Sequence, residues 1–318
     1  MGSKRASVFA AVIFAFLAVP LAAQAQVWPS RAVTFILPFG AGSATDAAAR
    51  VIAERLQKQW DKPVVIENRP GGDGLIAIRG FLSANDDHVL LYASSGSFLS
   101  HPYTLPEKPS YELMRDLVPL VQVAHTVPVV AAPAKLDVKS LRDWVELARS
   151  TQLNAAGAAG VPELSLRAFL KTSAPSAARV PYRDIVPAAN DLAESRIQLL
   201  FTSFAVVRPL VESGQIRILA IPSGERSPLL PAIASSAEQG FPSALMDTTS
   251  GIYGPAKLSA ADGSRIAKDV MTALSDPAVK TILNNTGQAP APGDGKVLAE
   301  TLTRQQEQVR RLAEIGLN

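Results

Sequence analysis

The hydrophobic pattern of this chain alternates between strand-like apolar runs and helical repeats. The run at 33–37 stops at Pro38, and apolar residues three or four positions apart then mark a helix that begins near residue 43. The next elements expected are a strand at 63–67, a helix at 75–83 and a strand at 89–93. Near-continuous apolar strands that alternate with helices predict a parallel sheet covered on both faces.

The second half of the pattern predicts another α/β unit and then a return to the first. The elements expected there are strands at 127–131, 197–201 and 216–221, and helices at 140–150 and through residue 170. Beyond Gly251 the periodicity becomes helical, at 259–274, 276–284 and 296–315. The predicted fold class is therefore α/β with two lobes, each a mainly parallel sheet flanked by helices, and a ligand cleft between them.

The turn after the first strand combines glycines with a helix start. Gly40 and Gly42 lie in a short loop, and Ser43 followed by Asp46 three positions later is typical of a capping box. Such a turn aims unpaired backbone N–H groups and the positive end of the helix dipole into one space, which favours an anion. In the alternative interpretation the glycines only make the turn and Asp46 only caps the helix.

Two further loops are small, uncharged and rich in hydrogen-bonding groups. Residues 94–97 follow the strand at 89–93, and open α/β sheets bind ligands at the carboxyl ends of their strands, so this loop and the one at 40–45 should share an edge. The loop expected at 155–160 is the counterpart in the second unit. Such loops suit recognition by backbone donors and hydroxyls more than bond breaking, unless they are ordinary tight turns.

Composition and the N-terminal pattern describe a globular, exported chain. The 318 residues are 47% hydrophobic and 19% charged, which allows two domains with ample core. Lys4 and Arg5 precede an apolar run at 8–19, and Ala23-Gln24-Ala25 then supplies a small-residue cleavage pattern. The run is too short for a comfortable membrane span, so we expect a signal peptide at 1–25, cleaved near Ala25, and a soluble periplasmic protein.

Charge and cysteine content exclude several functions. The formal net charge is only +3 and its positive residues are scattered, which offers no surface for nucleic acid. The chain has no cysteine, which excludes disulfides, thiolate metal sites and a lipid-anchoring cysteine.

The sequence lacks the motifs of cofactor binding and catalysis. The loop at 40–45 begins like a dinucleotide fingerprint but has Thr45 in place of the third glycine, and no Gly-Lys-Ser/Thr phosphate loop occurs. A G-x-S-x-G nucleophile elbow is missing, and His88, His101 and His125 lie apart, without metal-ligand spacing. We therefore expect no catalytic residue, no cofactor and no metal, with a nucleophilic site assembled from distant loops as the alternative.

Short motifs occur in a fixed order along the mature chain. They are residues 28–31, 38–46, 64–72, 94–97, 180–182, 213–217, 238–242 and 251–256. This series resembles the periplasmic substrate-binding receptors of tripartite tricarboxylate transporters, the Bug-type solute receptors. No single motif is decisive, but their order together with the signal peptide is specific.

The resemblance implies a two-domain periplasmic binding protein of type II that closes around its ligand like a flytrap. It implies a monomeric receptor, not an enzyme, that captures a small organic carboxylate and delivers it to membrane permease subunits. The residues expected to bind ligand are Phe39, Gly40, Ala41, Gly42, Ser43, Ala44, Thr45, Asp46, Ser94, Ser95, Gly96, Ser97, Ala156, Gly157, Ala158, Ala159, Tyr182, Thr202 and Ser203. Asp46 is expected to cap its helix and brace the loop, because a carboxylate facing a carboxylate is repulsive.

The chain departs from the family pattern in the second unit. Alanines and glycines at 155–160, followed by Val161, replace a loop rich in serine, glycine and threonine that ends in histidine. After Tyr182 the usual Lys-Gly is Arg183-Asp184, and the frequent Phe-Asp pair is replaced at 201–202 by Phe-Thr. We therefore predict a smaller or more apolar ligand half on that side, such as an aromatic or short-chain carboxylate.

The predicted domains are 26–125 together with 252–318, and 126–251. Hinges are expected near 124–127 and 250–252, where the chain would cross between lobes. Two other functions stay open. One is a receptor without its own permease that acts in ligand sensing, and the other is an exported hydrolase with Ser95 or Ser97 as nucleophile.

Overall fold

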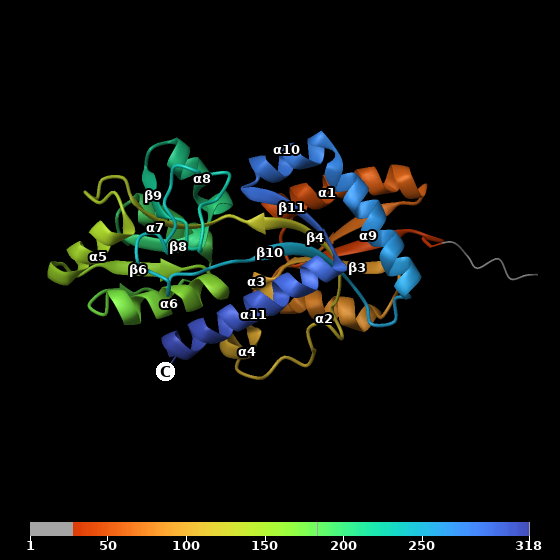
Figure 1. Cartoon of the computed structure of the whole chain (residues 1–318), viewed down its shortest axis with the longest axis horizontal. Helices are drawn as coiled ribbons and strands as arrows, with labels where there is room; N and C mark the ends of the chain where they lie inside the picture. The colour runs from red at the N-terminus through yellow and green to blue at the C-terminus, as the bar shows by residue number, and fades with distance from the viewer. Residues whose placement is uncertain (1–27, 183, 318) are drawn as a thin grey trace, which may run out of the picture.

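The computed structural model describes residues 28–182 and 184–317, and the predicted signal peptide lies outside them. Its strands form a six-stranded sheet in the order β11-β4-β10-β3-β1-β2 and a five-stranded sheet in the order β7-β6-β8-β5-β9. Figure 1 shows the two sheets side by side along the long axis of the molecule, each with its own helices. The two-lobed α/β fold class is therefore confirmed.

The first lobe contains the first and the last segments of the described chain. Its strands are β1 (Val33–Leu37), β2 (Val64–Asn68), β3 (Val89–Ser94), β4 (Val118–Thr126), β10 (Thr249–Gly254) and β11 (Gln288–Asp294). Its helices are α1 (Ala44–Trp60), the 3₁₀ turn η1 (Gly72–Gly74), α2 (Leu75–Ala84), α3 (Gly96–Leu99), α4 (His101–Thr104), α9 (Ala260–Ser275), α10 (Pro277–Asn285) and α11 (Gly295–Leu317).

The second lobe is built from the middle of the chain. Its strands are β5 (Pro128–Pro133), β6 (Asn154–Gly157), β7 (Ala178–Arg179), β8 (Leu199–Ser203) and β9 (Ile216–Ala220). Its helices are α5 (Leu141–Ser150), α6 (Val161–Ser173), α7 (Ile185–Ala193) and α8 (Phe204–Glu212).

Both sheets are mixed, which corrects the expectation that they are mainly parallel. In the first, β1 pairs in parallel with β2 and β3, whereas β10 is antiparallel to β3 and β4, and β11 is antiparallel to β4. In the second, β6 is parallel to β7 and β8, but β5 is antiparallel to β8 and β9. The reason is the double crossing between lobes: β4 leads the chain out of the first sheet and β10 brings it back in the opposite direction.

Three strands of the first sheet were not predicted. The polar residues Gln122 and His125 interrupt the apolar run of β4, and β11 contains two prolines and a glycine. Proline cannot donate a ladder hydrogen bond, so it is confined to edge strands and bulges. β11 meets that condition, since it is an edge strand with an irregular register between Pro290 and Gly293.

Part of the loop expected at 155–160 is in fact a strand. Ala155, Ala156 and Gly157 belong to β6 and pair in register with β8. Their small size reflects packing, because an ideal Cβ at Gly157 would lie 2.9 Å from the Cα of Glu163 in α6. Only residues 158–160 remain as the turn that leads into α6.

Each sheet has buried apolar side chains on both faces. In β1, Phe35 and Leu37 pack in the core beneath α1, while Ile36 points to the opposite face, beneath α2 and α11. The core on that second face also contains Val161 and Leu164 of α6, so it continues from one lobe into the other.

The chain passes between the lobes twice, and a third contact joins them without a crossing. β4 is followed by β5 through Val127, and β10 begins at Thr249 after the return. The hinge expected at 250–252 lies inside β10, which is paired on both sides, so the second crossing precedes Thr249. Figure 1 shows α11 extending from the first lobe along α6 of the second.

Candidate functional site

A cleft between the lobes has the geometry of a small-ligand site. Its cavity volume is about 240 Å³, below the roughly 300–1,000 Å³ typical of pockets for drug-sized ligands. The lining residues are Phe39, Ala44, Thr45, Asp73, Ser94, Gly96, Ser97, Thr126, Ala158, Ala159, Pro162, Ile185, Thr202, Ser203, Ala205, Val206, Met246, Thr248, Ser250, Thr286, Gly287 and Gln288. Both sheets and several helix starts contribute to this surface.

Four helices of at least nine residues begin at the cleft. α1 presents Ala44 and Thr45, and α8 presents Ala205 and Val206. α6 presents Pro162, and α7 presents Ile185. The first turn of a helix has backbone N–H groups without intrahelical acceptors and carries the positive end of the helix dipole. Because α1 belongs to one lobe and α6 and α8 to the other, an anion in the cleft would be held from both sides.

The turn before α1 is fixed by Asp46, which does not line the cleft. Ser43 Oγ accepts a hydrogen bond from Asp46 N over 3.2 Å, and Asp46 Oδ2 accepts from Gly42 N over 2.9 Å. The predicted capping box is thus half formed, with its second bond shifted from Ser43 to Gly42. Burial alone would raise the pKa of Asp46, but hydrogen bonds from Arg50, Gly42 and Asn68 together lower it.

The loop after β3 divides its side chains between the cleft and the core. Ser94, Gly96 and Ser97 line the cleft. Ser95 is buried; its Oγ donates to Gln305 Oε1 over 2.7 Å and accepts from Thr249 N over 3.0 Å. Ser95 therefore braces β3 against α11 and β10, and among the described residues no histidine contacts its hydroxyl to activate it.

The second-lobe wall contains alanines and two hydroxyls. The cleft lining on this side includes four of the residues predicted to bind ligand, which are Ala158, Ala159, Thr202 and Ser203. Thr202 is only 1% exposed, and its Oγ1 has no hydrogen-bond partner within residues 28–182 and 184–317. A buried hydroxyl without a partner costs free energy, so Thr202 is suited to a partner in the cleft.

The remaining predicted residues lie away from the cleft lining. They are Gly40, Ala41, Gly42, Ser43, Asp46, Ser95, Ala156, Gly157 and Tyr182. Ala156 is buried in the core of the second sheet, and Tyr182 donates from its hydroxyl to Asp191 Oδ2 over 2.5 Å. Burial and this hydrogen bond raise the pKa of Tyr182 to about 12.

Several cleft residues were not predicted from the sequence. They come from strands and from crossings between the lobes that the hydrophobic pattern did not identify. These residues are Thr126, Met246, Thr248 and the segment 286–288. Asp73 could have been recognised in the sequence, because it is the one acidic residue in the glycine-rich break between β2 and α2.

The two lobes touch across the cleft in this structure. An ideal Cβ at Gly287 in the first lobe would lie 2.9 Å from Ala205 N in the second. On the other side, a Cβ at Gly160 would lie 3.2 Å from Gly96 O. Glycine at these two positions lets the lobes approach closely.

A second, larger hollow of about 590 Å³ lies on the first lobe, lined by parts of β4, α9 and α11. Each of the two helix starts there is capped by a side chain. Ser259 Oγ accepts from Asp262 N over 3.0 Å, and Asp294 Oδ1 accepts from Val297 N over 3.0 Å. The described residues that line this hollow all belong to the first lobe, so it does not lie between the lobes as the cleft does.

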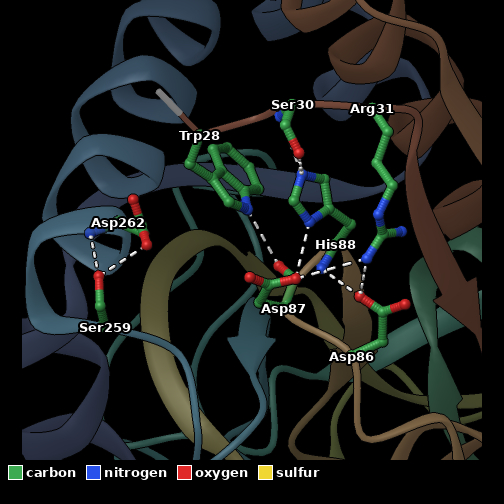
Figure 2. Close-up of polar contacts among 8 residues, drawn as sticks. All are labelled: Trp28, Ser30, Arg31, Asp86, Asp87, His88, Ser259 and Asp262. Carbon is green, nitrogen blue, oxygen red and sulfur yellow. Dashed lines mark hydrogen bonds and ion pairs between the residues drawn. The ribbon is translucent and has the colours of Figure 1, made fainter. Parts of the chain in front are cut away.

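Asp86, Asp87 and His88 form a group with metal-ligand side chains, shown in Figure 2. His88 Nε2 accepts from Ser30 N over 3.0 Å, so its Nδ1 carries the proton and donates to Asp87 Oδ1 over 2.7 Å. Asp86 pairs with Arg31 over 2.6 Å. Both ring nitrogens of His88 are therefore engaged, which leaves this histidine no free lone pair for a metal, and the contacts anchor the segment before β1.

None of the helices in the described part of the chain combines the length and the apolar character needed to cross a membrane.

Comparison with known proteins identifies relatives over most of the chain. The family model described as "Tripartite tricarboxylate transporter family receptor" matches residues 48–316. The protein BugT of Bordetella pertussis is 31% identical over 226 residues, which cover 69% of this chain and 69% of BugT.

Two solved structures of Rhodopseudomonas palustris proteins are similar in fold and sequence. One, with adipate, is 25% identical with a TM-score of 0.79, covering 91% of this chain and 98% of the other. MatC, with bound malate, is 25% identical with a TM-score of 0.71, covering 90% of this chain and 99% of MatC. The family model describes a transporter receptor, and both of these structures are named with a small carboxylate, so the chain is a binding receptor and not an enzyme.

Proposed function

Because this chain belongs to the tripartite tricarboxylate transporter family of receptors, we propose that it captures a small organic carboxylate in the cleft and delivers it to the membrane permease subunits of a tripartite transporter. It does so as a monomer in the periplasm, after removal of residues 1–25. The observation that carries the carboxylate assignment is the convergence of the α1, α6 and α8 N-termini on one cavity.

Binding of the carboxylate follows from the groups that the cleft offers. The backbone N–H groups at Ala44 and Thr45 and those at the start of α8 donate to the carboxylate oxygens. The hydroxyls of Ser97, Thr202 and Ser203 add neutral donors around them. The malate and adipate carried by two related structures support this ligand class.

The remainder of the ligand is small and partly apolar. Ala158, Ala159 and Pro162 offer no side-chain donor, and Ile185 and Val206 add apolar surface beside them. The cavity volume of about 240 Å³ suits a short-chain or monocyclic carboxylate. Capture from both lobes would couple binding to lobe closure, a hinge motion stabilised by contacts on each side.

Titration calorimetry on residues 26–318 with short aliphatic, aromatic, di- and tricarboxylates tests the receptor function. We expect at least one acid to bind with 1:1 stoichiometry, without turnover, and to raise the melting temperature. Small-angle scattering at saturation should show a smaller radius of gyration than that of the free protein.

Binding of none of these acids, or chemical conversion of one, would contradict the proposal. Uptake of the bound acid in cells lacking the permease subunits separates transport from sensing: loss of uptake supports transport, and retained uptake supports a sensing receptor.

A further inference from the structure

The cleft proposed for a carboxylate contains an acid. Among the described residues that line it, Asp73 is the only one with a charged side chain, and no lysine, arginine or histidine lines it. A lone carboxylate would repel the ligand class that the helix N-termini favour. Asp73 at this position would therefore weaken the binding of a simple carboxylate.

The fold holds Asp73 in an unusual backbone conformation. Its φ is 52°, in the left-handed region, which residues other than glycine occupy at a cost. His101 Nε2 donates to the backbone carbonyl of Asp73 over 2.9 Å, and Tyr111 Oη donates to His101 Nδ1 over 2.6 Å. His101 is fully buried, so this chain of hydrogen bonds anchors the Asp73 backbone to the first lobe.

The carboxylate of Asp73 has little compensation from the protein. Its side chain is half-buried, and Oδ2 accepts one long hydrogen bond of 3.4 Å from Ser100 Oγ. Within residues 28–182 and 184–317, Asp73 forms no ion pair. Burial raises the pKa of Asp73 to about 6, and a half-buried carboxylate that stays ionised above that pH is stabilised by a cation beside it.

The second lobe approaches the same carboxylate with the start of α6, but none of its described residues that line the cleft has a positively charged side chain. An ideal Cβ at Gly160 would lie 3.4 Å from Asp73 Oδ2, and Pro162 lines the cleft just beyond. The carboxylate therefore faces a closed cleft whose described lining residues include no positively charged side chain, so an ammonium group on the ligand would be its nearest full positive charge.

We propose that Asp73 determines specificity by pairing with an ammonium group of the ligand, which is then an amino-substituted carboxylate and not a simple acid. This inference rests on the proposed function, since the helix N-termini must hold the ligand carboxylate while Asp73 holds its ammonium. The two ends of a zwitterion thereby meet groups of opposite charge, whereas an acid without the ammonium leaves Asp73 unpaired.

Calorimetry with matched ligand pairs at pH 7.5 tests this specificity. The pairs are 2-aminobutyrate and 4-aminobutyrate against butyrate, and 4-(aminomethyl)benzoate against 4-methylbenzoate, with the wider acid panel as reference. We expect the preferred ammonium compound to bind at least tenfold more tightly than its partner. Asp73→Asn, which keeps the shape and tolerates the left-handed conformation, should abolish that preference.

The matched control is Asp137→Asn, which removes the same charge at an exposed second-lobe position outside the cleft lining. It should leave the preference unchanged. Circular dichroism and melting curves establish that both variants fold.

The outcomes separate the two hypotheses. If simple acids bind as tightly as their amino partners, or if the tightest ligand has no ammonium, Asp73 does not select ammonium, and the receptor function stands. The same holds if Asp73→Asn retains the preference. If no carboxylate binds at all, the receptor function and this inference both fail.

Discussion

Asn68 Nδ2 donates to Asp46 Oδ1 over 2.9 Å and thereby joins the end of β2 to the start of α1. The same amide nitrogen donates to Phe39 O over 3.0 Å. The Asn68 side chain therefore holds both the loop after β1 and Asp46, the residue that stabilises that loop. The N–H groups at the start of α1 face the cleft. The contact between Asn68 and Asp46 lies outside the cavity, but it fixes the position of these N–H groups inside it.

Replacing Asp46 should destabilise the first lobe. Asp46→Ala removes the acceptor for Gly42, Arg50 and Asn68, and hydrogen bonds to a buried charged group contribute about 1.5–3 kcal/mol each. We expect the free energy of unfolding, measured in urea at pH 7, to fall by about 2–4 kcal/mol. Asp137→Asn, at an exposed site, should change it by less than about 0.5 kcal/mol.

The same variant gives a pH test with a definite sign. The pKa of Asp46 is lower in the folded protein, so its contribution is fully present above the ordinary pKa of 3.8 and is lost as pH falls through the lower folded value. The difference in unfolding free energy between wild type and Asp46→Ala should narrow below pH 4. A difference that is constant from pH 7 to pH 3 would show that the Asp46 charge has no stabilising role.

Thr202→Val separates a ligand contact from a structural hydroxyl. Valine keeps the shape and removes the buried Oγ1 that has no partner in the described residues, so stability should stay level or rise by up to about 1 kcal/mol. Affinity for the ligand should fall about five- to tenfold by calorimetry. Unchanged affinity together with lower stability would place Thr202 in the fold alone.

Gly287→Ala tests whether ligand binding needs the close approach of the lobes. Gly287 has φ +69° and its ideal Cβ would lie 2.9 Å from Ala205 N, whereas Gly214 has φ +71° with no heavy atom within 4 Å of its ideal Cβ. Both alanine variants carry similar backbone strain, of about 1 kcal/mol. We expect ligand affinity to fall at least tenfold in Gly287→Ala and by less than twofold in Gly214→Ala.

A similar loss of affinity in both glycine variants would mean that backbone strain, not lobe contact, is responsible. Small-angle scattering with saturating ligand adds a direct observation. Gly287→Ala should keep a larger radius of gyration than the wild type.

The ligand-free stability of Asp73→Asn should depend on pH. Burial raises the folded pKa of Asp73 from 3.8 to about 6, so the ionised carboxylate opposes folding and this cost develops as pH rises from about 4 to 6. His101 and Tyr111, the titratable groups behind its backbone, are hydrogen-bonded to each other. At pH 7.5 the variant should unfold at a higher temperature than the wild type, and at pH 4 the difference should disappear; an equal shift at both values would exclude the charge as the cause.

Short sequence patterns predicted those parts of the site whose structure depends on residues close together in the sequence. The end of β1 at Leu37, the turn through Gly42 and the cap at Ser43 follow from short-range rules, and the structure places Ala44 and Thr45 in the cleft. Ser94–Ser97 could be located in sequence, but which hydroxyls face the cleft could not. That division depends on α11, which supplies Gln305 as the partner of Ser95 from 210 positions away.

The amino-acid sequence by itself determined the alternation of strands and helices, the helix starts and the family, because periodicity, capping residues and ordered motifs are local properties of the chain. The tertiary structure decided the mixed strand directions, the strand at 154–157 and the cavity wall, since these depend on which distant segments meet. Asp73 shows the difference most directly. Its charge is visible in the sequence, but only the packing of Ser100, His101 and Gly160 around it places that charge beside the cleft. There the carboxylate is half-buried and has no ion pair among the described residues.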